Sequence, residues 1–455
     1  MRNVWTLAGA GSLLFTACMV DGTAQPGDTP DPSGTGYSGS STGQAGSNVG
    51  TGMGGSSTTV PGGGSSAVGA AGSSSASGSN ASAGAAIGGA SSGGTSTGSG
   101  GSNVPIEGGS GNAETNPGKG TGFFPTTILP SHAKTAYTTW KTKYLKSCSG
   151  NRFRVAFNAD ETVSEGIGYG MLLTVAHGDR AEFDGLWAYY KSRSSGGLMG
   201  WKASGCDSTT DPNSASDADL DSAMALIQAA CKWGGSYLSE ATTLIANIKA
   251  KETIEGGTNY LKPASSGLDS CQNVSYASPA YYRAFAKKKP DQAAFWNKLA
   301  TDSYTQLNSA ANGSTGLVPN WSNMSGGAGC GGKPDGDRYG YDAARTPWRV
   351  ATDYVWNGTP AAKTYLGKLV TWVDGPAGGI TAIGDKYTLS GTKESVNHNS
   401  TFTGAFALAG MAQSQEKANL YGSAFRAVSD SAYYEESLRA VYMLLASGLF
   451  LNACD

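Results

Sequence analysis

Three acidic side chains in this sequence are surrounded by residue types suited to proton-transfer chemistry. Glu165 lies in the segment TVSEGIGYGM, Asp217 in ASDADLD and Asp342 in YGYDAARTPWR. Carboxyl groups can act together as general acid and general base when their surroundings keep one protonated and another ionised. Each segment also has a simpler structural explanation.

Glu165 is expected in the first turn of a helix, where the helix dipole alone would favour a carboxylate. Glycines at 166, 168 and 170 follow it, and they weaken a helix. Glycines in such places indicate that backbone or ligand must approach closely. Their spacing is not that of a phosphate-binding G-x-G-x-x-G loop, and the sequence predicts no strand before them. The segment therefore favours a functional Glu165.

The alternating aspartates around Asp217 could belong to a calcium-binding loop. An EF-hand loop needs glycine at its sixth position and glutamate at its twelfth, and this segment has Ser222 and Gln228 there. The segment instead runs into a helix that ends at Trp233. Helical spacing then places Asp217 and Asp221 on one face.

Asp342 is followed by Arg345 and Arg349. An ion pair with either arginine at a helix start would contribute little to stability if it were exposed. Two arginines and three aromatic residues beside one acid are more than a surface pair requires. A nearby guanidinium would also favour the ionised form of Asp342.

Hydrolysis of a glycosidic bond needs two such carboxyl groups, one protonated and one ionised. A separation of about 5 Å gives retention of configuration, whereas roughly 6.5–9.5 Å leaves room for a water molecule and gives inversion. The sequence does not contain this distance.

The three segments resemble conserved blocks of glycoside hydrolase family 8, the older cellulase family D. Residues 215–233 (ASDADLDSAMALIQAACKW) look like the family signature, except that Ser222 stands where Ile or Met is usual. SEGIGYGM is similar to the acid-bearing segment and YDAARTPWR to the base-bearing one. Further matching segments occur in the family's order between about 130 and 450: LMGWK at 198–202, SY at 275–276, PAYY at 279–282 and LVPNW at 317–321.

This resemblance implies an (α/α)6 barrel with an open substrate groove and inversion by single displacement, without a metal or other cofactor. It assigns Glu165 as general acid and Asp342 as general base. It also implies that Asp217 holds the distorted sugar and that Tyr276 positions the attacking water. Burial and the nearby charge of Asp217 would raise the pKa of Glu165, as its role requires.

Four further residues are candidates for substrate binding. Tyr169, Trp201 and Tyr341 could line the groove, because apolar ring faces pack against the C–H faces of sugars. Arg345 is the fourth candidate. Core packing is the alternative explanation for the three aromatic residues.

The hydrophobic periodicity predicts an all-α domain. About a dozen paired helices fit a double-layered helical toroid, the (α/α)6 barrel, although periodicity alone indicates only helices. Long glycine-rich loops at 194–215 and 312–340 are expected to carry function. The predicted helices cover 134–146, 164–177, 180–193, 216–233, 238–254, 278–288, 291–311, 342–356, 360–373, 400–414 and 431–449.

Composition divides the chain into three parts. Residues 1–18 resemble an export signal, in which FTAC ends at Cys18 like a bacterial lipobox with Phe15 in place of leucine. Ordinary signal cleavage near Ala17 is the alternative. Residues 19–118 are rich in Gly, Ser and Thr and predict a disordered linker. Residues 119–455 form the predicted catalytic domain.

The remaining six cysteines predict up to three disulfides with 15 connectivities, which is typical of exported proteins. Net charge is −2, and no basic stripe indicates nucleic-acid binding. No Cys/His cluster has the spacing of a zinc site. We therefore expect a monomeric, secreted or cell-surface bacterial lipoprotein, with membrane anchoring through a lipidated Cys18.

The predicted function is a secreted, inverting endo-β-1,4-glucanase that acts on cellulose or a related β-linked polysaccharide. Xylanase, chitosanase and lichenase activities are the alternatives within the family. A surface carbohydrate-binding protein without catalysis is the alternative from another class. The presence of Glu165, Asp217 and Asp342 together argues against it, because binding alone does not need all three ionisable groups.

Overall fold

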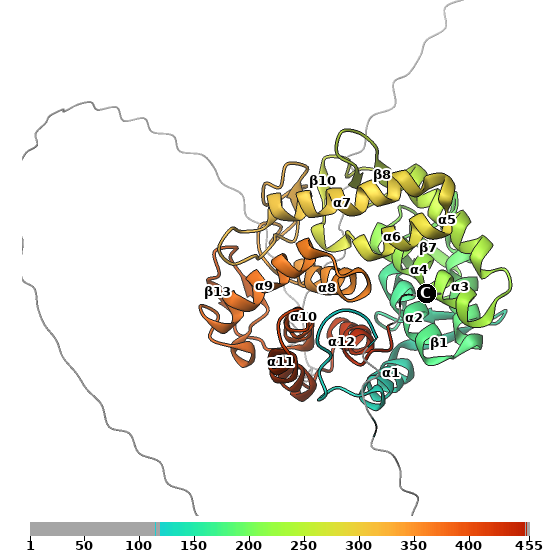
Figure 1. Cartoon of the computed structure of the whole chain (residues 1–455). Helices are drawn as coiled ribbons and strands as arrows, with labels where there is room; N and C mark the ends of the chain where they lie inside the picture. The colour runs from blue at the N-terminus through green and yellow to red at the C-terminus, as the bar shows by residue number, and fades with distance from the viewer. Residues whose placement is uncertain (1–113, 115–118, 451, 453–455) are drawn as a thin grey trace, which may run out of the picture. The chain divides into compact units, whose positions relative to one another are not determined.

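The computed structural model of the protein describes residues 114, 119–450 and 452. Helices dominate this part of the chain and alternate between two layers (Figure 1). The inner layer consists of α2 (Ser164–His177), α4 (Ser216–Trp233), α6 (Pro279–Lys288), α8 (Thr346–Asn357), α10 (Ser400–Gly410) and α12 (Tyr433–Ala446). The outer layer consists of α1 (Pro130–Tyr144), α3 (Arg180–Ser192), α5 (Tyr237–Glu252), α7 (Ala293–Ala310), α9 (Pro360–Asp374) and α11 (Gln415–Ala427).

The six inner helices form a closed ring. Each packs against the next inner helix along the chain, and α12 packs against α2. Each outer helix packs on the inner helix that precedes it, while α1 packs on α12. The described residues therefore form an (α/α)6 barrel, and the predicted fold is confirmed.

Burial distinguishes the two layers. Every residue of the inner helix α10 is buried, whereas α11 buries only Ala418, Tyr421, Gly422 and Phe425. This i, i+3, i+4, i+7 spacing gives an outer helix one apolar stripe. An inner helix has neighbours on every side, so apolar side chains cover its whole surface.

The predicted ranges match α2 and α4 at both ends. The helix α11 was missed, and the helix predicted over 400–414 is too long, since α10 ends at Gly410. Ser414 begins the new helix, because its side chain accepts a hydrogen bond from the backbone N–H of Lys417. The predicted helix at 342–356 also begins differently, with the 3-10 turn η3 (Ala343–Arg345) before α8.

The strands are short antiparallel pairs in the loops. The pairs are β1 (Leu145–Cys148) with β2 (Arg152–Val155), β4 (Ser194–Ser195) with β5 (Leu198–Met199), β8 (Thr253–Ile254) with β9 (Tyr260–Leu261), β10 (Cys271–Gln272) with β11 (Ser322–Asn323) and β12 (Lys386–Tyr387) with β13 (Lys393–Ser395). A three-stranded sheet joins β3 (Glu161–Val163), β6 (Lys202–Ser204) and β7 (Ser208–Asp211). The loops also contain the 3-10 turns η1 (Val274–Tyr276), η2 (Pro290–Gln292) and η4 (Ile380–Ala382).

Disulfides fasten these loops to one another. Cys148 pairs with Cys206 and Cys271 pairs with Cys330, and Cys231 is disulfide-bonded as well. The prediction that these cysteines form disulfides is confirmed for these five residues.

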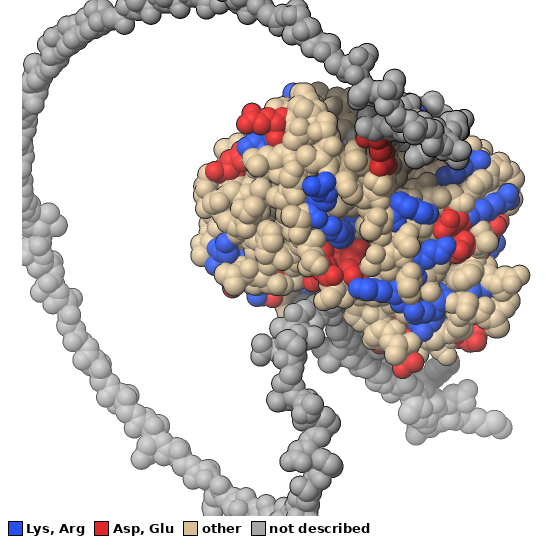
Figure 2. Space-filling view, turned by 90° about the horizontal axis from the view of Figure 1, so that it is seen from below, with Lys and Arg blue, Asp and Glu red and all other residues tan. Residues whose placement is uncertain are grey.

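Residues 1–113, which include the predicted signal peptide, Cys18 and most of the predicted linker, lie outside the described residues. Within the described part, none of the helices combines the length and apolar character needed to cross a membrane. The face of the molecule in Figure 2 carries acidic and basic side chains next to one another, beside a broad area without charge.

Candidate active site

The three predicted catalytic carboxylates come from the inner ring. Glu165 is the second residue of α2, Asp217 is the second residue of α4, and Asp342 directly precedes η3. Helices α2 and α4 pack closely along their length. A Cβ atom at Gly168 would come within 2.9 Å of the Asp221 side chain. The glycines after Glu165 therefore serve close packing of α2 on its neighbours.

Arg345 joins all three carboxylates. Its Nη1 donates to Glu165 Oε2 at 2.5 Å and to Asp217 Oδ2 at 2.8 Å, and its Nη2 donates to Asp342 Oδ1 at 2.7 Å. The Arg345 side chain is only 2% exposed. One buried positive charge thus faces three acidic groups.

Burial, more than the neighbouring acidic groups, changes the protonation of Glu165. Burial, together with the charges of Asp217 and Asp342, raises the pKa of Glu165 to about 8 against the opposing effect of Arg345. Glu165 is therefore protonated at neutral pH, as a general acid requires. The expected cause, burial together with Asp217, agrees with this result.

Asp342 is the most exposed of the three, with 18% of its side chain accessible. Burial raises the pKa of Asp342, while Arg345 and the side chains of Trp321 and Asn273 lower it. The Trp321 indole Nε1 donates to Asp342 Oδ2 at 3.0 Å. Arg345 thus acts on Asp342 in the predicted direction, although burial outweighs it.

Arg349, the other arginine considered as a partner of Asp342, pairs with Asp221. Its Nη1 and Nη2 donate to the two carboxylate oxygens of Asp221 at 2.5 and 2.9 Å. Its guanidinium lies 4.0 Å from the ring centre of Trp348. Asp217 and Asp221 do lie on one face of α4, as predicted, but each meets a different arginine.

Tyr276 lies beside the carboxylate cluster. It is the last residue of η1, and the guanidinium of Arg345 lies 5.0 Å from the centre of its ring. Its ring also contacts that of Trp321, edge to face, at 6.4 Å between centroids. This location is compatible with the predicted role beside the base.

Two of the four predicted substrate-binding residues are partly exposed. Trp201 and Tyr341 both pack against the core with part of their surface accessible. The Tyr341 hydroxyl donates to Asp385 Oδ2 at 2.7 Å. Both residues remain candidates for contact with a sugar.

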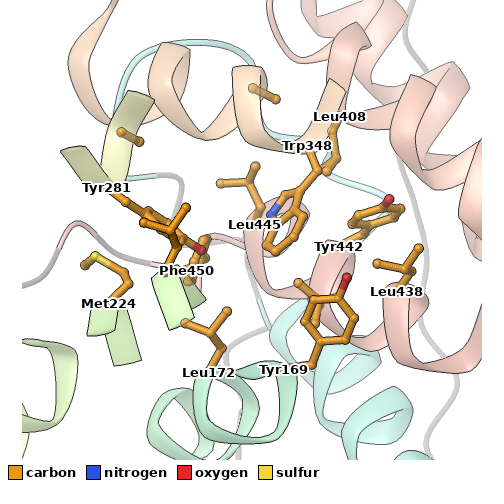
Figure 3. Close-up of a cluster of buried hydrophobic side chains, with 14 of the residues drawn as sticks. Tyr169, Leu172, Met224, Tyr281, Trp348, Leu408, Leu438, Tyr442, Leu445 and Phe450 are labelled. Carbon is orange, nitrogen blue, oxygen red and sulfur yellow. The ribbon is translucent and has the colours of Figure 1, made fainter. Parts of the chain in front are cut away.

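The other two predictions need correction. Tyr169 is completely buried, and its ring packs edge to face on Trp348 inside the barrel, among Leu438 and Tyr442 (Figure 3). Because Tyr169 points into the inner ring, a sugar cannot reach it. Arg345 is also buried beneath the carboxylates that it holds, so it positions acidic groups and presents no surface to a substrate.

Two residues of this site were not predicted. Trp321 ends the LVPNW segment that matched the family, so its position was noticed but not its hydrogen bond to Asp342. Asn273 lies just before η1 and faces Asp342. An isolated asparagine before a 3-10 turn carries no sequence signal for such a role.

The cluster can perform acid–base chemistry with its own side chains. Glu165 holds a proton at neutral pH, and Asp342 is the accessible carboxylate. In the described part of the chain no group of three or more His, Cys, Asp or Glu side chains is arranged to hold a metal ion. The positive charge between the three carboxylates is the guanidinium of Arg345.

Comparison with known proteins agrees with this chemistry. A family model described as Glycosyl hydrolases family 8 matches residues 127–448. Endoglucanase A of Acetivibrio thermocellus is 38% identical over 341 residues, which cover 70% of this chain and 69% of that protein. A beta-glucanase of Niallia circulans is 31% identical over 357 residues, covering 70% and 85% of the two chains.

A solved structure of a related enzyme has the same fold. The structure of a beta-1,3-1,4-glucanase from Paenibacillus sp. X4 superimposes with a TM-score of 0.66 at 29% identity, covering 72% of this chain and 95% of that one. The fold and the carboxylate cluster define a glycoside hydrolase of the (α/α)6 type. The chain belongs to glycoside hydrolase family 8.

Proposed function

We propose that the protein is an endo-β-1,4-glucanase that hydrolyses cellulose or a related β-glucan with inversion of configuration. The convergence of Glu165, Asp217 and Asp342 on the buried Arg345 is the observation that carries this proposal, and the raised pKa of Glu165 supports it. The names of its relatives, endoglucanase and beta-glucanase, support a β-glucan as the substrate.

In the proposed reaction Glu165 donates its proton to the glycosidic oxygen as the C1–O bond breaks. Asp342 removes a proton from a water molecule, whose oxygen forms the new bond to C1 from the opposite side. Asp217 accepts hydrogen bonds from the distorted sugar at the cleavage point, and Tyr276 helps to hold the water. Trp201 and Tyr341 offer ring faces to neighbouring sugars.

The activity is tested by measuring reducing-end release from carboxymethylcellulose, mixed-linkage β-glucan, xylan and chitosan side by side. We expect release from carboxymethylcellulose, together with a rapid fall in its viscosity because cleavage is internal. NMR of the first products should show the α-anomer. No release from any polymer would leave a carbohydrate-binding protein, and a β-anomeric product would refute inversion.

Mixed-linkage β-glucan is the second candidate substrate. The similarity to the beta-1,3-1,4-glucanase of Paenibacillus sp. X4 favours it. Faster release from this glucan than from carboxymethylcellulose, at equal mass concentration, would assign the protein as a lichenase.

We further propose that the protein is exported and anchored through a lipidated Cys18. The disulfides Cys148–Cys206 and Cys271–Cys330 support an oxidising compartment. In a bacterial host, detergent phase partition of the full chain and of Cys18→Ala tests the anchor. The wild-type chain should enter the detergent phase and the variant should not. Equal partition of the two would refute lipidation.

A further inference from the structure

The side-chain amide of Asn273 has a fixed orientation. Its Oδ1 accepts hydrogen bonds from the backbone N–H of Ser275 at 3.1 Å and from the Ser275 hydroxyl at 2.6 Å. A backbone N–H can only donate, so the amide atom that meets it must be the oxygen. The amide nitrogen Nδ2 therefore points away from Ser275.

This nitrogen is a buried donor that lacks a full hydrogen bond. Asn273 is 4% exposed, and among the described residues no acceptor completes a hydrogen bond to its Nδ2. The Asp342 carboxylate is the acceptor toward which this amide donates, and that donation lowers the pKa of Asp342, although the contact falls short of full hydrogen-bond geometry. An unsatisfied buried donor costs about 1–3 kcal/mol, so proteins keep one where a ligand or a water molecule uses it.

The surrounding structure holds Asn273 rigidly against the base. Strand β10 pairs with β11, which follows Trp321 directly. The Cys271–Cys330 disulfide fastens the same segment two residues before Asn273. On the other side, η1 packs against η3, the turn that follows Asp342.

We propose that Asn273 is a further catalytic residue whose Nδ2 donates a hydrogen bond to the attacking water. The inference rests on the proposed hydrolase function. The water donates one proton to Asp342 and accepts from Asn273 with one lone pair, so its second lone pair is directed at C1. As its oxygen bonds to C1, the water loses a proton to Asp342, while Glu165 protonates the departing oxygen.

Asn273→Ala and Asn273→Asp test this role on whichever β-glucan the wild-type protein cleaves. The alanine variant should lose about 10- to 100-fold in kcat with little change in KM, because misplacing one reactant costs that much. Aryl cello-oligosaccharides with good leaving groups should show the same loss, since water attack is still required. The aspartate variant places a second carboxylate beside Asp342 and should shift the acidic limb of the pH profile upward.

Asn259→Ala is the matched control. Asn259 is also a buried asparagine, 1% exposed; its side chain accepts from the backbone N–H of Gly256, and its own backbone N–H donates to Asp302. This control should lower the melting temperature but keep the wild-type kcat and pH profile in the folded fraction.

The outcomes separate the two proposals. If the wild-type protein cleaves no polymer, the proposed function fails. If the wild-type protein is active and Asn273→Ala keeps its kcat, or if good leaving groups restore the variant's rate, the role of Asn273 is refuted.

Discussion

Two arginines of one segment face two aspartates of α4, and the two contacts differ in their charge balance. Arg349 meets Asp221 alone, in a bidentate pair. Arg345 lies one helical turn earlier and meets Asp217, Glu165 and Asp342 together. Both the arginines and the aspartates are spaced by one helical turn, yet one contact is a balanced ion pair and the other is an acidic cluster with one cation.

This difference separates a framework contact from the proposed catalytic one. The buried pair fixes α4 against α8, and Arg349 opposes the rise that burial causes in the pKa of Asp221. The unbalanced cluster cannot keep three carboxylates ionised beside one guanidinium, so burial and repulsion raise the pKa of Glu165 to about 8. The cluster therefore holds one proton, on Glu165, at neutral pH.

The largest expected effect comes from Asp342→Asn, which removes the proposed base of the unbalanced cluster. We expect a loss of about 10²- to 10⁴-fold in kcat/KM on every substrate. Glu165→Gln should lose as much on polymers, but it should recover on aryl glycosides whose leaving groups need no proton. Steady-state kinetics on both substrate types measure this, and equal losses that no leaving group relieves would contradict the division of roles.

The balanced pair should matter for stability. Arg349→Met leaves Asp221 as an unpaired buried charge, and we expect a loss of about 3–5 kcal/mol in the free energy of unfolding. The double variant Asp221→Leu/Arg349→Met should recover much of this loss. Urea unfolding measures both variants, and a double variant as unstable as the single one would show that the pair acts by more than charge balance.

The remaining aspartate of α4, Asp219, extends the comparison, because no arginine of the described residues forms an ion pair with it. Asp219 accepts a hydrogen bond from Tyr190 and faces Glu252, whose other partner is the Ser214 hydroxyl. Burial raises the pKa of Asp219 to about 7, and burial with the charge of Asp219 raises the pKa of Glu252 well above its ordinary value. The folded protein therefore retains protons here that the unfolded chain releases above about pH 4.

This retention predicts a stability that falls as pH rises from about 4 through 7 and beyond. In Glu252→Gln the amide cannot ionise and can donate to Asp219, so the decline should be shallower. We expect the variant to exceed the wild-type protein by on the order of 2 kcal/mol at pH 8.5 and by less at pH 5. Unfolding curves at both pH values test this, and parallel pH dependence of the two proteins would refute proton retention by Glu252 in the folded state.

A surface pair should have the smallest effect. Lys249 and Glu255 lie 2.9 Å apart, with Glu255 65% exposed. Glu255→Ala should change the free energy of unfolding by less than about 1 kcal/mol, because water screens the pair. A larger change in urea unfolding would mean that charge balance matters outside the barrel interior too.

The sequence predicted the acidic segments and the helices that carry them, because glycines and alternating aspartates mark α2 and α4. It could not assign partners to Arg345 and Arg349, since both follow Asp342 at helical spacing. Only the packing of α4 against this segment decides that Arg345 meets Asp217 and Arg349 meets Asp221. Tyr169 was misjudged for a related reason. An inner helix of the barrel is apolar on every side, so the sequence does not indicate which aromatic side chain faces the substrate.

The protonation of Glu165 is the central claim, and infrared difference titration of the wild-type protein against Glu165→Gln tests it most directly. The account predicts a protonated-carboxyl band at pH 6 that is absent from the variant and disappears around pH 8, with activity declining over the same range. A Glu165 that is already ionised at pH 6 would contradict the account.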